Sequence, residues 1–233
     1  MKILIASSIH ADAVEQLKQH HDVISAINAP TDELVAKVRD RELIIFRSGV
    51  SITTDVMSAA PNLKFLVRAG SGLDNLDVEY TVKNNIQLVR IPEPGAKAVA
   101  ELSFAFMLML SRNLLKADNE WRKGHWIKSE MNGYLLTGKV LGIVGAGNIG
   151  SRVGRMGAAW GMNVLGCVEF PSKEIENDLK AQGIKLTTCD EVIRNSDYIS
   201  IHVPLTDKTR NMINANVLNR MKKGSYLMNL ARG

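Results

Sequence analysis

The sequence predicts an α/β protein built from two doubly wound parallel-sheet domains, and three observations support this fold class. Short apolar segments rich in Val, Ile and Leu alternate with helical segments along nearly the whole chain. These segments are apolar at almost every position, which is typical of strands covered on both faces. The alternation is interrupted at residues 91–95, where two prolines and a glycine separate one series of elements from the next.

The first series begins with the apolar N-terminal segment. Strands are predicted at residues 2–6, 22–26, 43–46, 65–67 and 86–89. Helices are predicted between them at residues 12–20, 32–39 and 54–60. Residues 97–118 follow as one long helix that is apolar on nearly every side, so we expect it to be buried either in a domain core or in a subunit interface.

The second series begins at Lys139. Strands are predicted at residues 140–144, 163–168, 185–187, 198–203 and 225–230. Helices are predicted at residues 148–160, 173–182, 190–195 and 214–221. The two series together predict one domain at residues 1–96 and a second domain at residues 97–233.

The composition is that of a folded globular protein. Of the 233 residues, 45% are apolar and 23% are charged, which excludes disorder as the main state. The net charge is +5, but the basic residues are scattered, so no nucleic-acid partner is expected. No apolar run reaches the ~18 residues of a membrane helix, so no membrane partner is expected either. Cys167 and Cys189 lack the spacing of a zinc site or a disulfide framework, so we expect no metal and a reducing, cytoplasmic location.

The most specific motif is the glycine-rich turn Gly145-Ala146-Gly147-Asn148-Ile149-Gly150. It follows a predicted strand and opens a predicted helix, which is the context of a dinucleotide-binding turn. Gly145 permits the tight turn, Gly147 lets the backbone approach a pyrophosphate, and Gly150 lets the helix pack closely against the strand. The helix N-terminus directs free N–H groups and a positive dipole end toward the phosphates. A purely structural turn is the alternative.

An acidic residue near the tip of the second strand of this series would hold the adenosine ribose hydroxyls. Glu169 is the only acid at that tip, so it is the candidate, and an exposed strand-end glutamate is the alternative. Its negative charge would disfavour the extra phosphate of NADP. Lys173 lies close by in the sequence and weakens this preference, so the predicted cofactor is NAD, with NADP as the alternative.

Further segments occur along the chain in a recognisable order: RAGSGLDN at residues 68–75, PGAKAVAE at 94–101, RKGHW at 122–126, LTGKVLG at 136–142, HVPLT at 202–206 and NLARG at 229–233. Together with the glycine turn, they resemble the motifs of the D-isomer-specific 2-hydroxyacid dehydrogenase family. The resemblance extends through nearly the whole chain, and the joint occurrence of these motifs is highly specific. It is strongest with the members that act on phosphoglycerate.

The resemblance implies a flavodoxin-like substrate domain followed by a Rossmann NAD-binding domain that is incomplete at its C-terminal end. The implied reaction is hydride transfer between NAD and the C2 carbon of a small 2-hydroxy acid, in particular 3-phosphoglycerate in serine biosynthesis. Arg232 would bind the substrate carboxylate and carbonyl oxygen, because a planar guanidinium can grip a carboxylate bidentately. The other implied substrate residues are Arg47 and Ser48, which would meet the phosphate, and Gly70, Ser71 and Gly72, which would meet the carboxylate. A solvated strand-end arginine and an ordinary flexible turn are the alternatives for these two groups.

On the cofactor side, the resemblance places Asn148 and Ile149 at the pyrophosphate. The other implied cofactor contacts are Val203 and Pro204 at the adenine–nicotinamide edge, and Ser71, Leu230, Ala231 and Arg232 toward the nicotinamide. His202 is expected to be structural or to line the cofactor, because the family's catalytic histidine comes later in the chain.

Two features depart from the family pattern. Val168 occupies the strand-tip position where the family usually has Asp, and Glu169 would face the opposite side if the strand continued. The chain ends at Gly233, before the glutamate and the histidine that the family uses for proton transfer. We therefore expect an N-terminal portion of such an enzyme, with little or no turnover of its own.

The resemblance also implies a homodimer formed through the helix near residues 99–115 and the loop that carries Trp121 and Trp126. Two other functions stay open at this point. One is an NAD-responsive binding protein or corepressor-like protein on the same scaffold. The other is an inactive truncated homologue.

Overall fold

The computed structural model describes residues 1–231, and the chain divides into two compact units, Met1–Gly95 and Ala96–Gly233. Each unit has its own five-stranded sheet and its own hydrophobic core. All strand pairs in both sheets are parallel.

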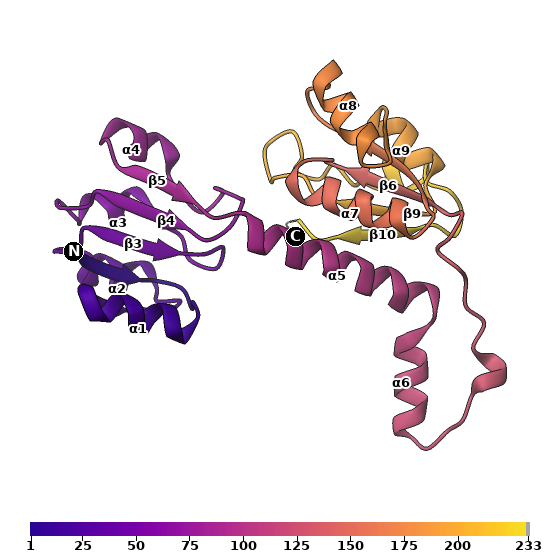
Figure 1. Ribbon diagram of the computed structural model, residues 1–233, viewed down its shortest axis with the longest axis horizontal. Helices are drawn as coiled ribbons and strands as arrows, with labels where there is room; N and C mark the ends of the chain where they lie inside the picture. Colours follow the sequence, from indigo (N-terminus) through magenta and orange to yellow (C-terminus); the bar gives the residue numbers. More distant parts are fainter. Residues whose placement is uncertain (232–233) are drawn as a thin grey trace. The chain divides into compact units, whose positions relative to one another are not determined.

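The first unit is a parallel sheet whose successive strands are connected along the chain by helices (Figure 1). Its elements are β1 (Lys2–Ile5), α1 (Ala11–His20), β2 (Asp22–Ser25), α2 (Thr31–Lys37), β3 (Leu43–Phe46), α3 (Thr54–Ser58), β4 (Phe65–Arg68), α4 (Val78–Lys83) and β5 (Gln87–Arg90). The strand order is β2-β1-β3-β4-β5, so the winding direction reverses between β1 and β3. Leu4, Ile44 and Leu66 are paired across three neighbouring strands and are completely buried, as expected of a sheet covered on both faces.

The second unit has the same architecture with a different strand order. Its elements are α5 (Glu93–Ser111), which begins at the end of the first unit, α6 (Leu114–Arg122), the short 3₁₀ helix η1 (Lys128–Glu130), β6 (Val140–Val144), α7 (Asn148–Ala159), β7 (Asn163–Cys167), α8 (Lys173–Ala181), β8 (Ile184–Leu186), α9 (Cys189–Asn195), β9 (Tyr198–Ile201), α10 (Ala215–Leu218) and β10 (Tyr226–Asn229). The order β10-β9-β6-β7-β8 places β6 at the centre, where Leu141 and Ile143 are completely buried. The winding direction reverses between β6 and β9.

The predicted fold class of two doubly wound parallel sheets is confirmed by these strand orders. Each predicted strand is present, with bounds that differ by at most two residues. The helix α4 was not predicted. Its signal is Asp77, whose side chain accepts a hydrogen bond from the Tyr80 amide and so caps the first turn.

The prediction of one helix over residues 97–118 is wrong at both ends. α5 begins at Glu93, because Pro94 lies in the first turn, where a helix needs no amide donor. α5 ends at Ser111, and Asn113 takes a left-handed conformation with φ of 52°. This conformation cannot continue a right-handed helix, so α6 starts as a separate element at an angle of 69° to α5.

The apolar surface of α5 is divided between buried and exposed sides. Phe104 and Met107 belong to the core of the second unit, whereas Leu102 and Phe106 are exposed. Within residues 1–231, no single helix is long and apolar enough to cross a membrane. Only the bent pair α5 and α6, taken together, meets that test of length and composition.

Candidate functional site

The candidate cofactor site lies where the second sheet reverses its winding direction. In open α/β sheets, ligands bind in the crevice outside the carboxyl ends of the two strands at this reversal. Here these strands are β6 and β9, which pair in parallel with Val144 opposite Ile201. The glycine-rich turn follows β6, and His202 and Val203 follow β9, so the predicted motifs meet at this crevice.

The turn is tight because its backbone is packed against both neighbouring strands. Gly145 has φ of +93°, and a Cβ atom there would lie 2.8 Å from Val203 Cγ1. The amides of Gly145 and Ala146 donate to the Cys167 carbonyl at 3.1 and 2.9 Å, which ties the turn to the end of β7. A Cβ atom at Gly150 would lie only 2.2 Å from the Gly145 carbonyl oxygen. These two glycines are therefore required by the fold itself.

Gly147 differs from the other two glycines because its surroundings are open. It has extended backbone angles, and a Cβ atom there would have no protein atom within 4 Å. Gly147 is the N-cap of α7, and no side chain caps this helix. The first-turn amides of α7 therefore need an outside acceptor, and an anionic phosphate suits their partial positive charge. This end of the helix fits the pyrophosphate of a dinucleotide.

The tip of β7 carries the predicted ribose residue. The strand ends at Cys167, so simple alternation between faces does not extend to Val168 and Glu169. Val168 packs against the core, and Glu169 is exposed. The Glu169 carboxylate forms an ion pair with Lys208 at 2.9 Å. Lys173, which the sequence suggested as a neighbouring charge, pairs instead with Glu176 at 3.0 Å.

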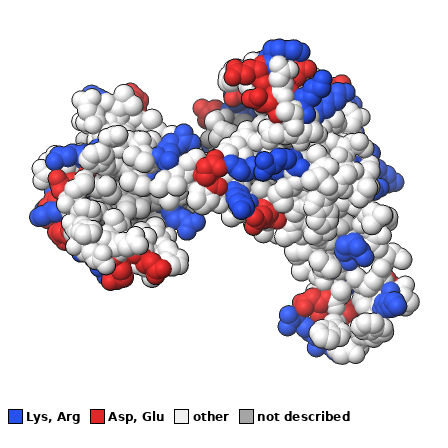
Figure 2. All heavy atoms as spheres, in the orientation of Figure 1, with Lys and Arg blue, Asp and Glu red and all other residues white. Residues whose placement is uncertain are grey.

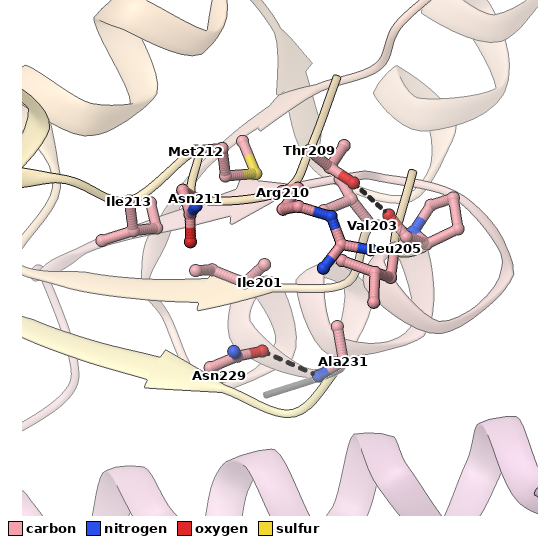
Figure 3. A pocket seen from close by; sticks show the side chains of 11 residues that line it. Ile201, Val203, Leu205, Thr209, Arg210, Asn211, Met212, Ile213, Asn229 and Ala231 are labelled. Carbon is pink, nitrogen blue, oxygen red and sulfur yellow. Dashed lines mark hydrogen bonds between the residues drawn. The ribbon is translucent and has the colours of Figure 1, made fainter. Parts of the chain in front are cut away.

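A cavity of about 220 Å³ lies next to this crevice (Figure 3). It is lined by Ile201, Val203, Pro204, Leu205, Thr209, Arg210, Asn211, Met212, Ile213, Asn229 and Ala231. The segment after β9 forms one wall, and the ends of β9 and β10 form the other. The cavity thus brings together the predicted residues Val203, Pro204 and Ala231.

Two other predicted residues of the last segment, Leu230 and Arg232, are not among the residues that line the cavity in the described part of the chain. Leu230 packs against the hydrophobic core that contains Ile143, so it does not line the cavity. Arg232, the predicted catalytic residue, lies outside the residues that the structure describes, and its predicted role stays a prediction.

The sequence did not predict the cavity wall that contains Thr209 and Arg210. Thr209 donates to the Pro204 carbonyl at 2.5 Å and accepts from the Thr206 amide at 2.8 Å, which closes the loop. Arg210 brings a positive charge to the lining. The signal in the sequence was two threonines three residues apart after a proline, which is a weak turn pattern without the structure.

His202 follows β9 next to the glycine turn, where its backbone packs against Gly145 and its side chain is largely buried. Its Nε2 atom is 2.8 Å from Ser200 Oγ. Within residues 1–231, its Nδ1 atom is buried and makes no hydrogen bond. Burial lowers the pKa of His202 from its ordinary value of 6.5 to about 4. The ring is therefore neutral near pH 7. The expected structural or cofactor-lining role of His202 stays a prediction.

One group of predicted substrate residues lies at the corresponding reversal point of the first sheet, between β1 and β3. Arg47 and Ser48 follow β3 and are exposed, and the Arg47 amide donates to Ser7 Oγ, after β1, at 2.9 Å. The Asn75 side chain donates to the carbonyls of Arg47 and Val50. Asn75 therefore joins the loop after β3 to the loop after β4.

The loop of Gly70, Ser71 and Gly72 is supported from below by Arg68. This arginine is only 1% exposed, and its guanidinium donates to the carbonyls of Gly72 and Ala69 at 3.1 and 3.3 Å. A Cβ atom at Gly70 would lie 2.6 Å from the guanidinium, so the loop requires glycine there. The structure thus places both predicted substrate groups at the carboxyl ends of the neighbouring strands β3 and β4.

The surface charges do not single out another site on the face drawn in Figure 2. Lys and Arg side chains form several separate groups on this face, with Asp and Glu among them. Exposed ion pairs, such as Lys116 with Glu130 and Arg122 with Asp118, also occur in the second unit.

Comparisons with known proteins bear on these sites. Residues 104–233 match the family model "D-isomer specific 2-hydroxyacid dehydrogenase, NAD binding domain". The chain belongs to this family. The glycine turn, the tip of β7 and the cavity all lie within the part that matches the family's NAD binding domain, which agrees with the predicted nicotinamide cofactor.

Individual members of the D-2-hydroxyacid dehydrogenase family are similar over the whole chain. D-3-phosphoglycerate dehydrogenase of Methanocaldococcus jannaschii is 36% identical, and the chain covers 44% of its length. Hydroxypyruvate reductase of Thermotoga maritima is 33% identical, and the chain covers 74% of its length. The crystal structure of D-lactate dehydrogenase from Aquifex aeolicus, complexed with NAD and lactic acid, is similar with a TM-score of 0.82 at 32% identity. The alignment with that structure covers all of this chain and 69% of the solved chain.

Proposed function

We propose that this chain supplies the substrate-binding and cofactor-binding parts of an NAD-dependent D-2-hydroxyacid dehydrogenase that interconverts 3-phospho-D-glycerate and 3-phosphohydroxypyruvate. The observation that carries the proposal is the N-terminus of α7, which no side chain caps. It lies at the reversal point of the second sheet, and the space around its N-cap residue, Gly147, is open. When bound, a nicotinamide dinucleotide supplies the acceptor for the hydride that leaves C2 of the hydroxy acid. Residues 1–96 would form the substrate-binding domain and residues 97–233 the NAD-binding domain.

The first unit would recognise a substrate that carries two anionic groups. The Gly70 amide already donates to the Arg68 carbonyl at 3.0 Å, so Ser71 and Gly72 are the better candidates for binding the carboxylate. The Arg47 guanidinium, exposed after β3, would bind the phosphate. Hydroxypyruvate has no phosphate and would not use Arg47, so this residue separates the two substrates that the names of the similar proteins suggest.

Arg232 completes the proposal by resemblance to the family. A guanidinium there would orient the carboxylate and stabilise the negative charge that develops on the carbonyl oxygen during hydride transfer. Residues 1–233 contain no Glu–His pair after Arg232 to move the hydroxyl proton. The chain alone is therefore expected to bind its ligands with little or no turnover.

A homodimer is part of the proposal, and the apolar surface around α6 supports it. Trp121 and Trp126 are 69% and 79% exposed. They line a concavity of about 780 Å³ together with Leu114, Ala117, Asp118, His125, Ile127, Lys128 and Met131. Exposed tryptophans in a concave apolar surface are typical of a protein interface. Light scattering at micromolar concentration should give the mass of a dimer, and a monomer would contradict this part of the proposal.

The substrate proposal is tested by thermal unfolding in the presence of NADH. At ten times its dissociation constant, 3-phosphohydroxypyruvate should raise Tm by roughly 3–6 °C. The Arg47→Ala variant should lose this rise, whereas Arg39→Ala, an exposed arginine after α2, should keep it. If hydroxypyruvate raises Tm equally and Arg47→Ala changes neither rise, the phosphate assignment is wrong.

The same experiment separates the alternative functions. A rise in Tm with NADH but with neither oxo acid would favour an NAD-responsive binding protein over a dehydrogenase. The cytoplasmic location, the role in serine biosynthesis and the expectation of no nucleic-acid, membrane or metal partner stay predictions.

A further inference from the structure

The two cysteines of the chain, Cys167 and Cys189, lie close together in the second unit, although 22 positions separate them. β7 and β8 pair in parallel with Gly166 opposite Leu186, and the Thr187 amide donates to the Gly166 carbonyl at 2.8 Å. Cys167 is the next residue of β7, and Cys189 opens α9 two residues after Thr187. The strand register therefore brings the two cysteines to the same edge of the sheet.

The two thiols have different surroundings. Cys167 is 6% exposed and belongs to the same buried cluster as Val192 and Ile193 of α9. Cys189 is exposed at the start of that helix. Each thiol is the largest influence on the ionisation of the other: the neighbouring Cys167 lowers the pKa of Cys189 to about 7, and Cys189, together with burial, raises the pKa of Cys167.

Two charged groups near Cys189 have opposite effects on the pKa of its thiol. Arg220 lowers the pKa of Cys189, and Asp190 raises it. Arg220 and Asp190 also form an ion pair with each other. An exposed thiol with a lowered pKa reacts with oxidants sooner than a buried one, so Cys189 is the thiol that reacts first.

Cys167 is also linked directly to the candidate cofactor site. Its carbonyl accepts the amides of both Gly145 and Ala146, the first two residues of the glycine turn. Val168 and Glu169, at the strand tip, follow it in the chain. A covalent bond at the Cys167 side chain would therefore act on the residue that anchors the turn and leads to Glu169.

We propose that Cys167 and Cys189 form a site of reversible oxidation by hydroperoxides, in which an intramolecular disulfide forms and weakens dinucleotide binding at the glycine turn. The second half of this proposal rests on the proposed function. The first half depends only on the positions of the two thiols.

One hydroperoxide oxidises the two thiols to one disulfide in two steps. The Cys189 thiolate attacks one peroxide oxygen, the O–O bond breaks, and the leaving oxygen takes up a proton to become water or an alcohol. The resulting sulfenic acid of Cys189 is then attacked by the Cys167 sulfur. The S–S bond forms, the S–O bond breaks, and the hydroxide leaves with the proton of Cys167 as water. The two sulfurs together lose two electrons, and the peroxide gains them.

Intact mass tests the first half, because the chain contains only two cysteines. One equivalent of hydrogen peroxide should remove two hydrogen atoms from the monomer and leave no free thiol, and dithiothreitol should reverse both changes. An unreduced tryptic digest should contain the Cys167 and Cys189 peptides as one linked species. The proposal is overturned if the chain gains oxygen atoms without this link, or if only disulfides between two chains form.

Single variants assign the order of events. Cys189→Ser changes an exposed position and should fold, and its remaining thiol should survive one equivalent of peroxide. Cys167→Ser should instead accumulate the sulfenic acid of Cys189, which a dimedone label detects. Equal reactivity of the two variants would contradict the proposed order.

NADH titration of the reduced and the oxidised chain tests the second half. The dissociation constant should be about fivefold higher for the oxidised chain, and peroxide should leave that of Cys189→Ser unchanged. Equal affinities of the two wild-type forms would overturn the regulatory half alone. If the reduced chain does not bind NADH, the proposed function fails, while the mass measurement still decides whether the disulfide forms.

Discussion

The ammonium group of Lys208 lies 2.9 Å from the Glu169 carboxylate and joins the loop after β9 to the tip of β7. The same ammonium lies 5.8 Å from the ring centre of Phe170. In dinucleotide-binding folds, an acid at this strand tip accepts the ribose hydroxyls of NAD, whereas a nearby cation accommodates the 2′-phosphate of NADP. In this chain the acid, Glu169, and the cation, Lys208, form an ion pair with each other. Each of them therefore influences how the other would bind the ribose or the 2′-phosphate.

Removal of Lys208 should therefore strengthen the preference for NAD over NADP. In Lys208→Ala the affinity for NADPH should fall by about five- to tenfold relative to NADH, because a 2′-phosphate would lose its cation. Glu169→Gln should shift the ratio in the opposite direction. Fluorescence titration of the two reduced cofactors gives both constants. Lys173→Ala is the matched control, since Lys173 pairs with Glu176, and an equal shift in this variant would refute the assignment to Lys208.

The three glycines of the turn should separate folding from cofactor binding. Gly147→Ala should leave the free energy of unfolding within about 0.5 kcal/mol of the wild type, because the new methyl group has open space. It should weaken NADH binding at least about tenfold, since the methyl group keeps the pyrophosphate from the backbone. Gly150→Ala should lower the free energy of unfolding by more than about 2 kcal/mol, because its Cβ would overlap the Gly145 carbonyl. Urea unfolding and calorimetry measure the two effects, and full NADH affinity in Gly147→Ala would be the contradicting result.

The stability of the chain should fall as the pH drops below neutrality, and His202 should cause part of the loss. Burial lowers the pKa of His202 to about 4, so between pH 6.5 and pH 4 the unfolded chain binds a proton that the folded chain does not. The contribution of His202 to the free energy of unfolding should decrease by about 2 kcal/mol from pH 7.5 to pH 5. His202→Asn should show a loss smaller by that amount in urea unfolding at the two pH values. The exposed control His20→Asn should behave as the wild type, and identical pH dependence of all three chains would contradict the prediction.

Arg68 should support the loop that carries Ser71. Arg68→Met should lower the free energy of unfolding of the first unit by about 2–3 kcal/mol, because it removes charged hydrogen bonds to two loop carbonyls from a buried position. Arg90 also donates to this loop, at the Ser71 carbonyl, but it is exposed. Arg90→Met should therefore cost less than about 1 kcal/mol. Hydrogen exchange of the amides of β4 and β5 measures both variants, and equal losses would argue against a special role of the buried arginine.

The sequence was sufficient to predict the strands, the fold class and the family, because buried parallel strands leave continuous apolar segments. The bounds of the long helix were predicted wrongly, because single residues with unusual backbone requirements determine where α5 begins and ends. Pro94 looked like the end of an element but lies in the first turn of α5. Asn113, two residues after the end of α5, takes a left-handed conformation, and no strong sequence pattern surrounds it.

In the candidate site, too, some features could be predicted from the sequence and others could not. The glycine turn was predicted because its chemistry is local in sequence. The ion pair of Glu169 with Lys208 and the placement of Cys167 and Cys189 at one edge of the sheet both depend on the strand order, so they became visible only with the structure. Leu230 packs against the core that contains Ile143, and its predicted contact with the nicotinamide stays a prediction.

The glycine turn of this chain is proposed to bind a nicotinamide dinucleotide. Calorimetric titration of NADH into the reduced 233-residue chain tests it most directly, because binding does not require turnover. We predict saturable binding with one site per chain and a loss of affinity of at least about tenfold in Gly147→Ala. A folded chain that gives no binding signal with NADH or NADPH at millimolar concentration would show that the glycine turn does not bind a nicotinamide dinucleotide.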